Sequence, residues 1–145
     1  MKALIQRVKS ASVTIDGVLY SKIGHGLLVF VGVEKTDETV NADKLAEKII
    51  NLRIFEDVND KMNLSVKDVK GDILIVSQFT LCGDCKKGTR PSFDKSAPLN
   101  KAVDLYEYFV NKVRESNLKI ETGKFRAMMN VELINDGPVT FFIEK

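Results

Sequence analysis

The chain has 145 residues, of which 44% are hydrophobic and 29% charged, with a formal net charge of +2 at pH 7. These values are ordinary for a single globular domain over residues 1–145, long enough to bury a core without disulfides or metals. So small a charge excludes binding to nucleic acid through overall charge alone, and an RNA partner would need local basic patches. No run of about 18 apolar residues and no signal-peptide pattern is present, so we expect a cytoplasmic protein without a membrane span.

The N-terminal part of the sequence predicts strands joined by a tight turn. Residues 2–8 form the first strand, and residues 12–15 and 18–23 flank an Asp-Gly pair that favours a hairpin. Arg7 lies inside the first strand, where we expect its side chain to point outward into solvent.

Two strand–helix units are expected next. The apolar runs at residues 27–33 and 72–76 do not alternate with polar residues, which favours strands covered on both faces. In residues 37–55 apolar side chains recur every three or four positions, which predicts an amphipathic helix capped by Thr36 or Asp37. A second helix is predicted after residue 98, and its apolar face consists of Leu99, Ala102, Val103, Tyr106, Phe109 and Val113.

The C-terminal third carries further strand-like segments, two of which meet at a Gly-Pro pair. Residues 131–134 and 139–143 are rich in apolar side chains, and Gly137 and Pro138 lie between them. Proline removes a backbone donor, and glycine allows another chain or a ligand to approach closely. A turn that ends a hairpin is the ordinary structure for such a pair. Residues 77–81 are also notable, because polar groups at the end of a buried strand often bind ligands.

Two interpretations of the chemistry follow from residue types alone. Cys82 and Cys85 have thioredoxin spacing, which would indicate redox chemistry or half of a zinc site. Against this, the pair does not open a helix after the first strand of a βαβ unit, and the only histidine, His25, is expected in a distant turn. A basic face would instead indicate RNA binding without catalysis, although such residues also form ordinary solvated surfaces. Its members are Lys86, Lys87, Arg90, Lys95, Lys124 and Arg126.

A third interpretation comes from two longer segments. Residues 77–81 (Ser-Gln-Phe-Thr-Leu) and 135–140 (Asn-Asp-Gly-Pro-Val-Thr) together resemble the paired signatures of the D-aminoacyl-tRNA deacylase family. The resemblance implies an α/β fold, a single layered domain with strands packed on strands and two main helices. The element order of two strands, two strand–helix units and about three strands is compatible with this fold. Further similar segments lie at residues 6–8, 26–29, 51–55, 61–64 and 90–93.

The resemblance implies an enzyme that hydrolyses the ester between a D-amino acid, or glycine, and the terminal adenosine of tRNA. It implies a homodimer in which the Gly-cisPro of one subunit enters the site of the other. Gly137 and Pro138 would then bind the substrate and reject L-aminoacyl esters through backbone contact. Met129 matches a position that lines the adenosine pocket. Neither a metal nor an organic cofactor is expected.

The catalytic segment implied by the resemblance is Ser77, Gln78, Phe79 and Thr80. Main-chain N–H groups around Gln78 and Phe79, released from the sheet at its end, would stabilise the oxyanion. Thr80 is the obvious nucleophile, but no nearby residue supplies the base that a threonine requires. Because the 2′-hydroxyl of the terminal ribose is also argued to assist in this family, we expect substrate-assisted catalysis with Thr80 shaping the pocket.

Contacts to tRNA are expected in the loop after Thr80, at Lys86, Lys87 and Arg90. The sequence departs from the family at residues 125–128, where Phe-Arg-Ala-Met replaces the common Phe-Gly-Ala followed by an acidic residue. The Arg side chain in this segment could approach a phosphate or could simply be exposed.

Overall fold

The two continuous apolar runs become the parallel centre of a sheet in the computed structural model, which describes all 145 residues. β3 (Gly26–Gly32) pairs in parallel with β6 (Asp72–Ser77). Buried odd-numbered side chains of both strands belong to one core cluster, and buried even-numbered ones belong to another. Both strands are therefore covered on two faces, as their lack of alternation predicts.

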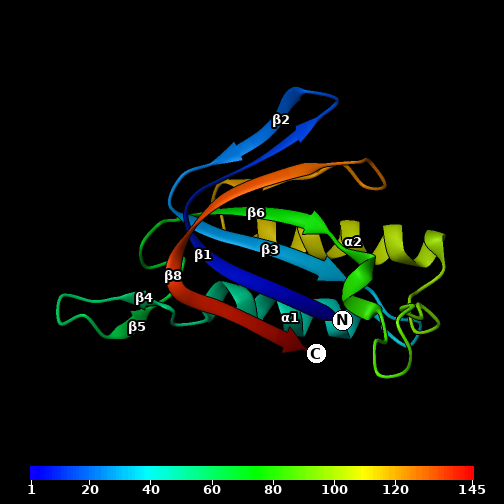
Figure 1. Cartoon of the computed structure of the whole chain (residues 1–145). Helices are drawn as coiled ribbons and strands as arrows, with labels where there is room; N and C mark the ends of the chain where they lie inside the picture. Colours follow the sequence, from blue (N-terminus) through cyan, green and yellow to red (C-terminus); the bar gives the residue numbers. More distant parts are fainter.

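Two helices cover one face of this sheet (Figure 1). α1 (Thr39–Asn51) and α2 (Leu99–Arg114) pack their apolar stripes into a cluster of 23 buried residues. The helical period predicts both stripes correctly in their centres, where Phe109 and Val113 have no exposed area. Leu99, predicted as core, is 45% exposed because it lies at the start of α2 beside the cavity described below.

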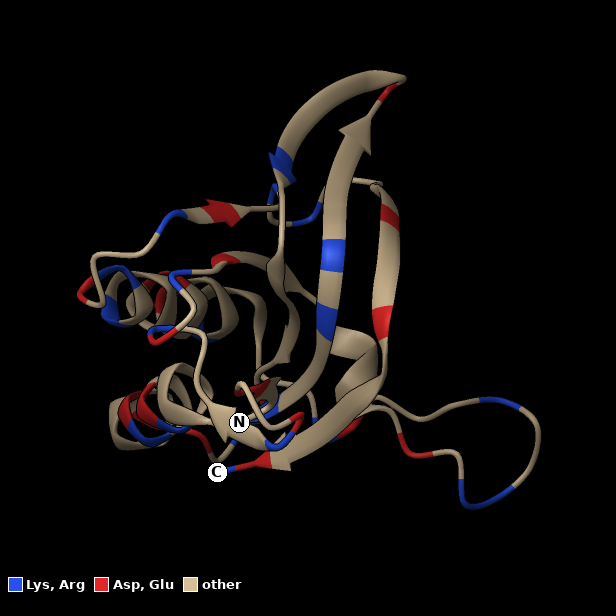
Figure 2. Ribbon diagram, turned by 90° about the vertical axis from the view of Figure 1, so that its left-hand side faces the viewer, with Lys and Arg blue, Asp and Glu red and all other residues tan.

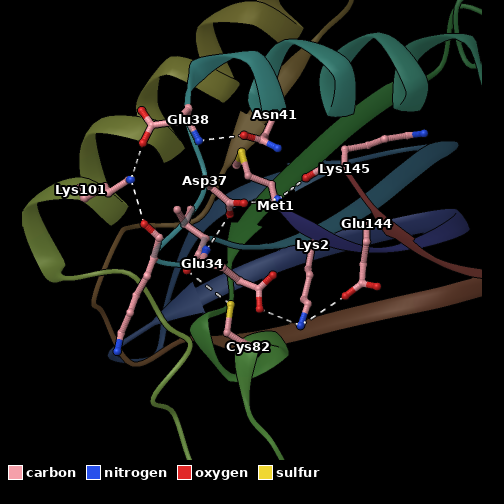
Figure 3. A network of polar contacts seen from close by, with 12 residues as sticks. Met1, Lys2, Glu34, Asp37, Glu38, Asn41, Cys82, Lys101, Glu144 and Lys145 are labelled. Atoms are coloured by element: carbon pink, nitrogen blue, oxygen red, sulfur yellow. Dashed lines mark hydrogen bonds and ion pairs between the residues drawn. The ribbon is translucent and has the colours of Figure 1, made fainter.

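α1 begins later than the cap predicted at position 36 or 37. Glu38 is the N-cap, and it forms a capping box with Asn41, whose side chain accepts a hydrogen bond from the Glu38 N–H at 2.8 Å. Asp37 is buried and lies 2.6 Å from the ammonium group of Met1 (Figure 3). A carboxylate engaged with this ammonium is not available to cap the helix.

A second set of ion pairs, centred on Lys2, lies at the same end of the sheet as Met1 (Figure 3). Lys2 Nζ lies 3.0 Å from Glu34 Oε1 and 3.3 Å from Glu144 Oε1. Burial by itself lowers the pKa of Lys2, but hydrogen bonds to the two carboxylates, and their charges, outweigh burial and raise that pKa. These contacts fasten the first strand to the last one and to the segment after β3.

β1 (Lys2–Ile15) is one strand of 14 residues, not the two segments predicted. Its first half pairs with β3 and the end of β8 (Asn130–Glu144), whereas its second half pairs with β2 (Val18–Ile23) and the start of β8. In Figure 1, β2 and the adjoining halves of β1 and β8 lie over one face of β3 and β6. Strands are thus packed on strands, as the resemblance implied. The buried residues between them are Val8, Ala11, Val13, Ile23, Leu28, Leu74 and Val76.

Short elements complete the fold. β7 (Ile120–Thr122) pairs in parallel with β6, so the main sheet runs β2-β1-β3-β6-β7, with β8 also paired to β1. β4 (Phe55–Glu56) and β5 (Met62–Leu64) form a small hairpin. A 3₁₀ helix, η1 (Phe79–Cys82), follows β6 directly. Neither α-helix has the length and apolar character that crossing a membrane would require.

Candidate active site

A cavity of about 740 Å³ opens where β6 ends, between η1, α2 and the segment that precedes β8. Its lining is mainly apolar, and Arg126 is its single charged residue. A cavity of this size and character suits a flat apolar ring system held by a few polar groups. The apolar lining consists of Val31, Val33, Val76, Phe79, Phe93, Ala97, Leu99, Ala102, Tyr106, Phe125, Ala127, Met128, Met129 and Val131. The polar lining consists of Ser77, Gln78 and Ser96.

The cavity brings together several of the predicted site residues. Ser77, Gln78 and Phe79 line it at the end of β6, and Met129 lines it from the segment before β8. Gly123 makes room for Met129, because a Cβ atom on Gly123 would lie 2.7 Å from Met129 Sδ. Residues about 50 positions apart in the sequence therefore form one wall.

Thr80 is exposed and lies outside the cavity lining. Its hydroxyl accepts a hydrogen bond from the side-chain amide of Gln78. An amide N–H is a donor and not a base, so this contact does not activate the hydroxyl as a nucleophile. The Thr80 hydroxyl thus holds the Gln78 side chain at the edge of the cavity.

The main-chain N–H groups at the end of β6 differ in their availability. The Gln78 N–H donates to the Val31 carbonyl oxygen at 2.7 Å, so it is not released from the sheet as predicted. Phe79 is the first residue of η1, and its N–H has no acceptor within the chain. The Phe79 N–H is therefore free to donate to a bound oxygen at this edge of the cavity.

An aromatic pair forms one side of the cavity. The rings of Phe79 and Phe93 lie 5.0 Å apart between centroids, which is a favourable contact distance for tilted rings. A Cβ atom on Gly83 would lie 3.0 Å from the Phe93 ring, so the glycine lets the loop after η1 fold close to the site. From the sequence alone, residues 90–93 are only a segment similar to the family, and Phe93 has no predicted role in the site.

Tyr106 belongs to the core, as the helical period predicts, and also forms another wall of the cavity. Its ring packs against Phe125 with centroids 5.6 Å apart, and its hydroxyl donates to the Ile75 carbonyl oxygen at 3.0 Å. Burial is the main cause that raises the pKa of Tyr106, so the hydroxyl stays neutral. A stripe with a period of 3.6 residues does not distinguish a core position from a cavity wall.

Gly137 and Pro138 do not form the turn of a hairpin. Asn135 pairs with Val8 and Thr140 with Gln6 in the β1–β8 ladder, so four residues of β8 oppose a single residue of β1. The segment is an extended bulge inside one strand, and its Gly-Pro peptide bond is cis. Both residues are exposed and neither lines the cavity of their own chain.

Arg7 is the β1 residue opposite this bulge, and the prediction that it points into solvent is wrong. Its side chain is buried, and its guanidinium group donates to the carbonyl oxygens of Asp136 at 3.0 Å and Ile54 at 2.8 Å. It also pairs with the carboxylates of Asp136 at 3.1 Å and Glu56 at 3.3 Å. Because the bulge and β4 cover this position, they supply the acceptors that a buried guanidinium requires.

The basic loop lies apart from the cavity lining. Lys86, Lys87 and Arg90 are exposed, have no ion-pair partner and lie on the long loop between η1 and α2 (Figure 2).

Cys82 is not suited to redox chemistry. It is buried, its thiol donates to the Val33 carbonyl oxygen at 3.4 Å, and burial raises the pKa of that thiol. The thiolate required for disulfide exchange is thus disfavoured at Cys82. No group of three or more His, Cys, Asp or Glu side chains is arranged to hold a metal ion.

Comparisons with known proteins give a consistent result. The D-Tyr-tRNA(Tyr) deacylase family matches residues 4–144. D-aminoacyl-tRNA deacylases of Geotalea uraniireducens (strain Rf4) and Geotalea daltonii (strain DSM 22248 / JCM 15807 / FRC-32) are 58% and 59% identical over 144 residues, which is 99% of this chain and 93% and 96% of those proteins.

Solved structures share the same fold. The c-Myc DNA unwinding element binding protein has a TM-score of 0.94 at 42% identity, over 100% of this chain and 99% of that one. A probable eukaryotic D-amino acid tRNA deacylase has a TM-score of 0.88 at 17% identity, over 99% and 98% of the two chains. With the family match over nearly the whole length, the chain belongs to the D-Tyr-tRNA(Tyr) deacylase family.

Proposed function

We propose that the protein hydrolyses the ester that joins a D-amino acid, or glycine, to the 3′-terminal adenosine of tRNA. The observation that carries this proposal is the apolar cavity at the end of β6, which has the free Phe79 N–H at its edge. The cavity can accept the adenine ring while the ester carbonyl lies near η1. Relatives named D-aminoacyl-tRNA deacylase support the same substrate class.

The reaction adds water to the ester carbonyl and breaks the bond to the ribose oxygen, which leaves with a proton. The tetrahedral intermediate carries an oxyanion, and the Phe79 N–H is the main-chain donor best placed to stabilise it. The Thr80 hydroxyl is hydrogen-bonded only to the Gln78 amide, so no side-chain nucleophile and base are paired here. The 2′-hydroxyl of the terminal ribose then assists the attack, and the protein mainly orients the substrate.

A second copy of the chain would complete the site. Gly137 and Pro138 are exposed and absent from the cavity of their own chain, and the strand that carries them has several exposed apolar side chains. Ile134, Phe141 and Phe142 of β8 are 58%, 40% and 52% exposed, which is unusual for a monomer surface and suits an interface between copies. In the proposed homodimer, Gly137 of the partner subunit enters the cavity with its Gly-Pro backbone beside residues 77–80.

A Gly-Pro backbone that enters the cavity from the partner subunit explains how D- and L-aminoacyl esters are distinguished without recognition of the amino-acid side chain. Main-chain carbonyl groups of the bulge would face the ammonium group and Cα of the substrate, where an L side chain has no room. A D side chain would point outward. Glycine has no side chain to reject, so glycyl-tRNA should also be a substrate.

The decisive experiment compares D-Tyr-tRNA and L-Tyr-tRNA with purified protein in EDTA. We expect loss of the D-ester alone, because the proposal requires neither metal nor organic cofactor. Equal hydrolysis of both esters, or strict metal dependence, would reject the proposal. An RNA-binding protein without catalysis would leave both esters intact, and a redox protein would reduce a disulfide substrate through Cys82 and Cys85.

A further inference from the structure

Arg126 is the one charged residue in an otherwise apolar and neutral cavity lining. Its side chain is exposed, and the structure contains no ion pair or hydrogen bond that involves it. No acidic residue lines the cavity. The cavity therefore presents an apolar interior with a single unpaired cation, which is the complement of a ring system that carries an anionic group.

The backbone at Arg126 adds an independent observation. Arg126 has φ of 63°, in the left-handed region that L side chains rarely adopt, whereas glycine adopts it without a steric penalty. The turn is held by a hydrogen bond from the Ala127 N–H to the Lys124 carbonyl oxygen at 3.2 Å. A large side chain thus occupies a position where glycine would be less strained.

We propose that the Arg126 guanidinium binds the phosphate on the 5′ side of the terminal adenosine. This inference rests on the proposed function, which places the adenine ring in the apolar part of the cavity. The 5′ phosphate is the anion covalently nearest to that ring, and a guanidinium group binds phosphate oxygens through paired N–H donors. The same cation repels the ammonium group of the aminoacyl ester. The substrate therefore binds with its phosphate, and not its ammonium group, next to Arg126.

Binding of small ligands tests the proposal without requiring hydrolysis. Nuclear magnetic resonance titrations of the full chain with 5′-AMP and with adenosine should give about five- to tenfold tighter binding of 5′-AMP at low salt. In Arg126→Gln the two ligands should bind equally, because only the phosphate contact is lost. Arg126→Lys should keep a preference for 5′-AMP, since it retains a cation.

Two further variants separate this role from other effects. Arg53→Gln removes one exposed arginine after α1, which is not part of the cavity lining, and should keep the full preference for 5′-AMP. Arg126→Gly relieves the left-handed backbone, so its melting temperature should equal or exceed that of the unmodified protein while the preference for 5′-AMP is lost. A combination of unchanged stability and lost phosphate preference is not expected for a merely structural residue.

The outcomes are distinguishable from those of the deacylase test. Equal affinity of the unmodified protein for 5′-AMP and adenosine, or an undiminished preference in Arg126→Gln, would overturn the role of Arg126. With D-tyrosyl esters, Arg126→Gln should raise KM for the ester of 5′-AMP about five- to tenfold, with no change for the ester of adenosine. Absence of hydrolysis in the unmodified protein would reject the proposed function. The titrations would still show whether Arg126 binds the phosphate of 5′-AMP.

Discussion

Arg7 and Asp136 are joined twice, because Arg7 Nε lies 3.0 Å from the main-chain oxygen of Asp136 and 3.1 Å from its Oδ2 atom. The two residues are 129 positions apart in the sequence. The same guanidinium donates to Ile54, so one side chain ties the bulge of β8 to the segment before β4. The side-chain amide of Asn135 holds the bulge from the other direction, donating to the carbonyl oxygens of Arg7 at 3.0 Å and Val139 at 3.2 Å.

Arg7→Leu should destabilise the protein by about 2–3 kcal/mol, since it leaves buried acceptors without a charged donor. Urea unfolding measures the change. In the proposed dimer, hydrolysis of D-Tyr-tRNA should fall by more than the loss of folded protein explains, because the Gly-Pro backbone loses its support. Lys9→Ala is the matched control, because Lys9 is exposed on the same strand and its loss should change stability by less than about 0.5 kcal/mol. A similarly small change in Arg7→Leu would contradict the structural role.

Gly123→Ala should alter the cavity more than the stability. The added Cβ would lie 2.7 Å from the flexible thioether of Met129, which can move, and at an ordinary contact distance of 3.5 Å from Val76 Cγ1, so the free energy of unfolding should change by less than about 1 kcal/mol. The displaced Met129 should raise KM for D-Tyr-tRNA. As a contrast, a Cβ on Gly26 would lie 1.9 Å from the Asp72 carbonyl oxygen in the neighbouring strand, so Gly26→Ala should cost at least about 3 kcal/mol. Similar losses of stability in the two variants would show that the Met129 wall is rigid.

Thr80→Val should reduce kcat for D-Tyr-tRNA by less than about tenfold, because the hydroxyl has no base and only orients Gln78. Replacing the terminal adenosine of the tRNA by 2′-deoxyadenosine should be far more damaging. Single-turnover hydrolysis measures both effects, and Thr80→Ser is the control that keeps the hydroxyl. A loss of about a thousandfold or more in Thr80→Val, with full activity on the deoxy substrate, would assign the attack to Thr80.

Tyr106→Phe should show a pH-dependent difference in stability. At neutral pH the variant leaves the Ile75 carbonyl oxygen without its donor and should be about 1 kcal/mol less stable. Burial raises the pKa of Tyr106 above its ordinary value of 10.0, so above that pH the unfolded chain releases a proton that the folded chain retains. The advantage of Tyr106 should therefore shrink as the pH rises, by up to about 1 kcal/mol at pH 10.5. Urea unfolding at several pH values measures the difference, and a constant difference would mean that Tyr106 titrates normally.

The basic loop should make a modest, salt-dependent contribution to tRNA binding. Lys86→Ala, Lys87→Ala and Arg90→Ala should each weaken binding at low salt and reduce the slope of log affinity against log salt by about 0.7–0.9. Fluorescence titration with tRNA at several salt concentrations gives these slopes. Lys9→Ala, at an exposed position of β1 and away from this loop in the sequence, lowers the net charge by the same amount and is the control. Unchanged affinity in all three loop variants would make this loop an ordinary solvated surface.

Much of the framework can be predicted from local sequence pattern. The apolar runs of β3 and β6, the centres of both helical stripes and the polar end of β6 follow from side-chain periodicity, because each reports burial within one element. Residues 77–81, which carry the resemblance, lie at the end of β6, and Ser77, Gln78 and Phe79 line the cavity there. These features need no knowledge of which strands pair.

The remaining features depend on partners far away in the sequence. A guanidinium in a strand is normally solvated, and only the bulge of β8 and the segment before β4 convert Arg7 into a buried, fully engaged group. A Gly-Pro pair normally ends a hairpin, and only the continuous pairing of β8 with β1 makes it an exposed bulge. The sequence by itself thus determined most of the elements and placed polar groups at the end of β6. Tertiary structure decided which backbone and side-chain groups are left free, because long-range pairing consumes some hydrogen-bonding groups, such as the Gln78 N–H, and leaves others, such as the Phe79 N–H, available.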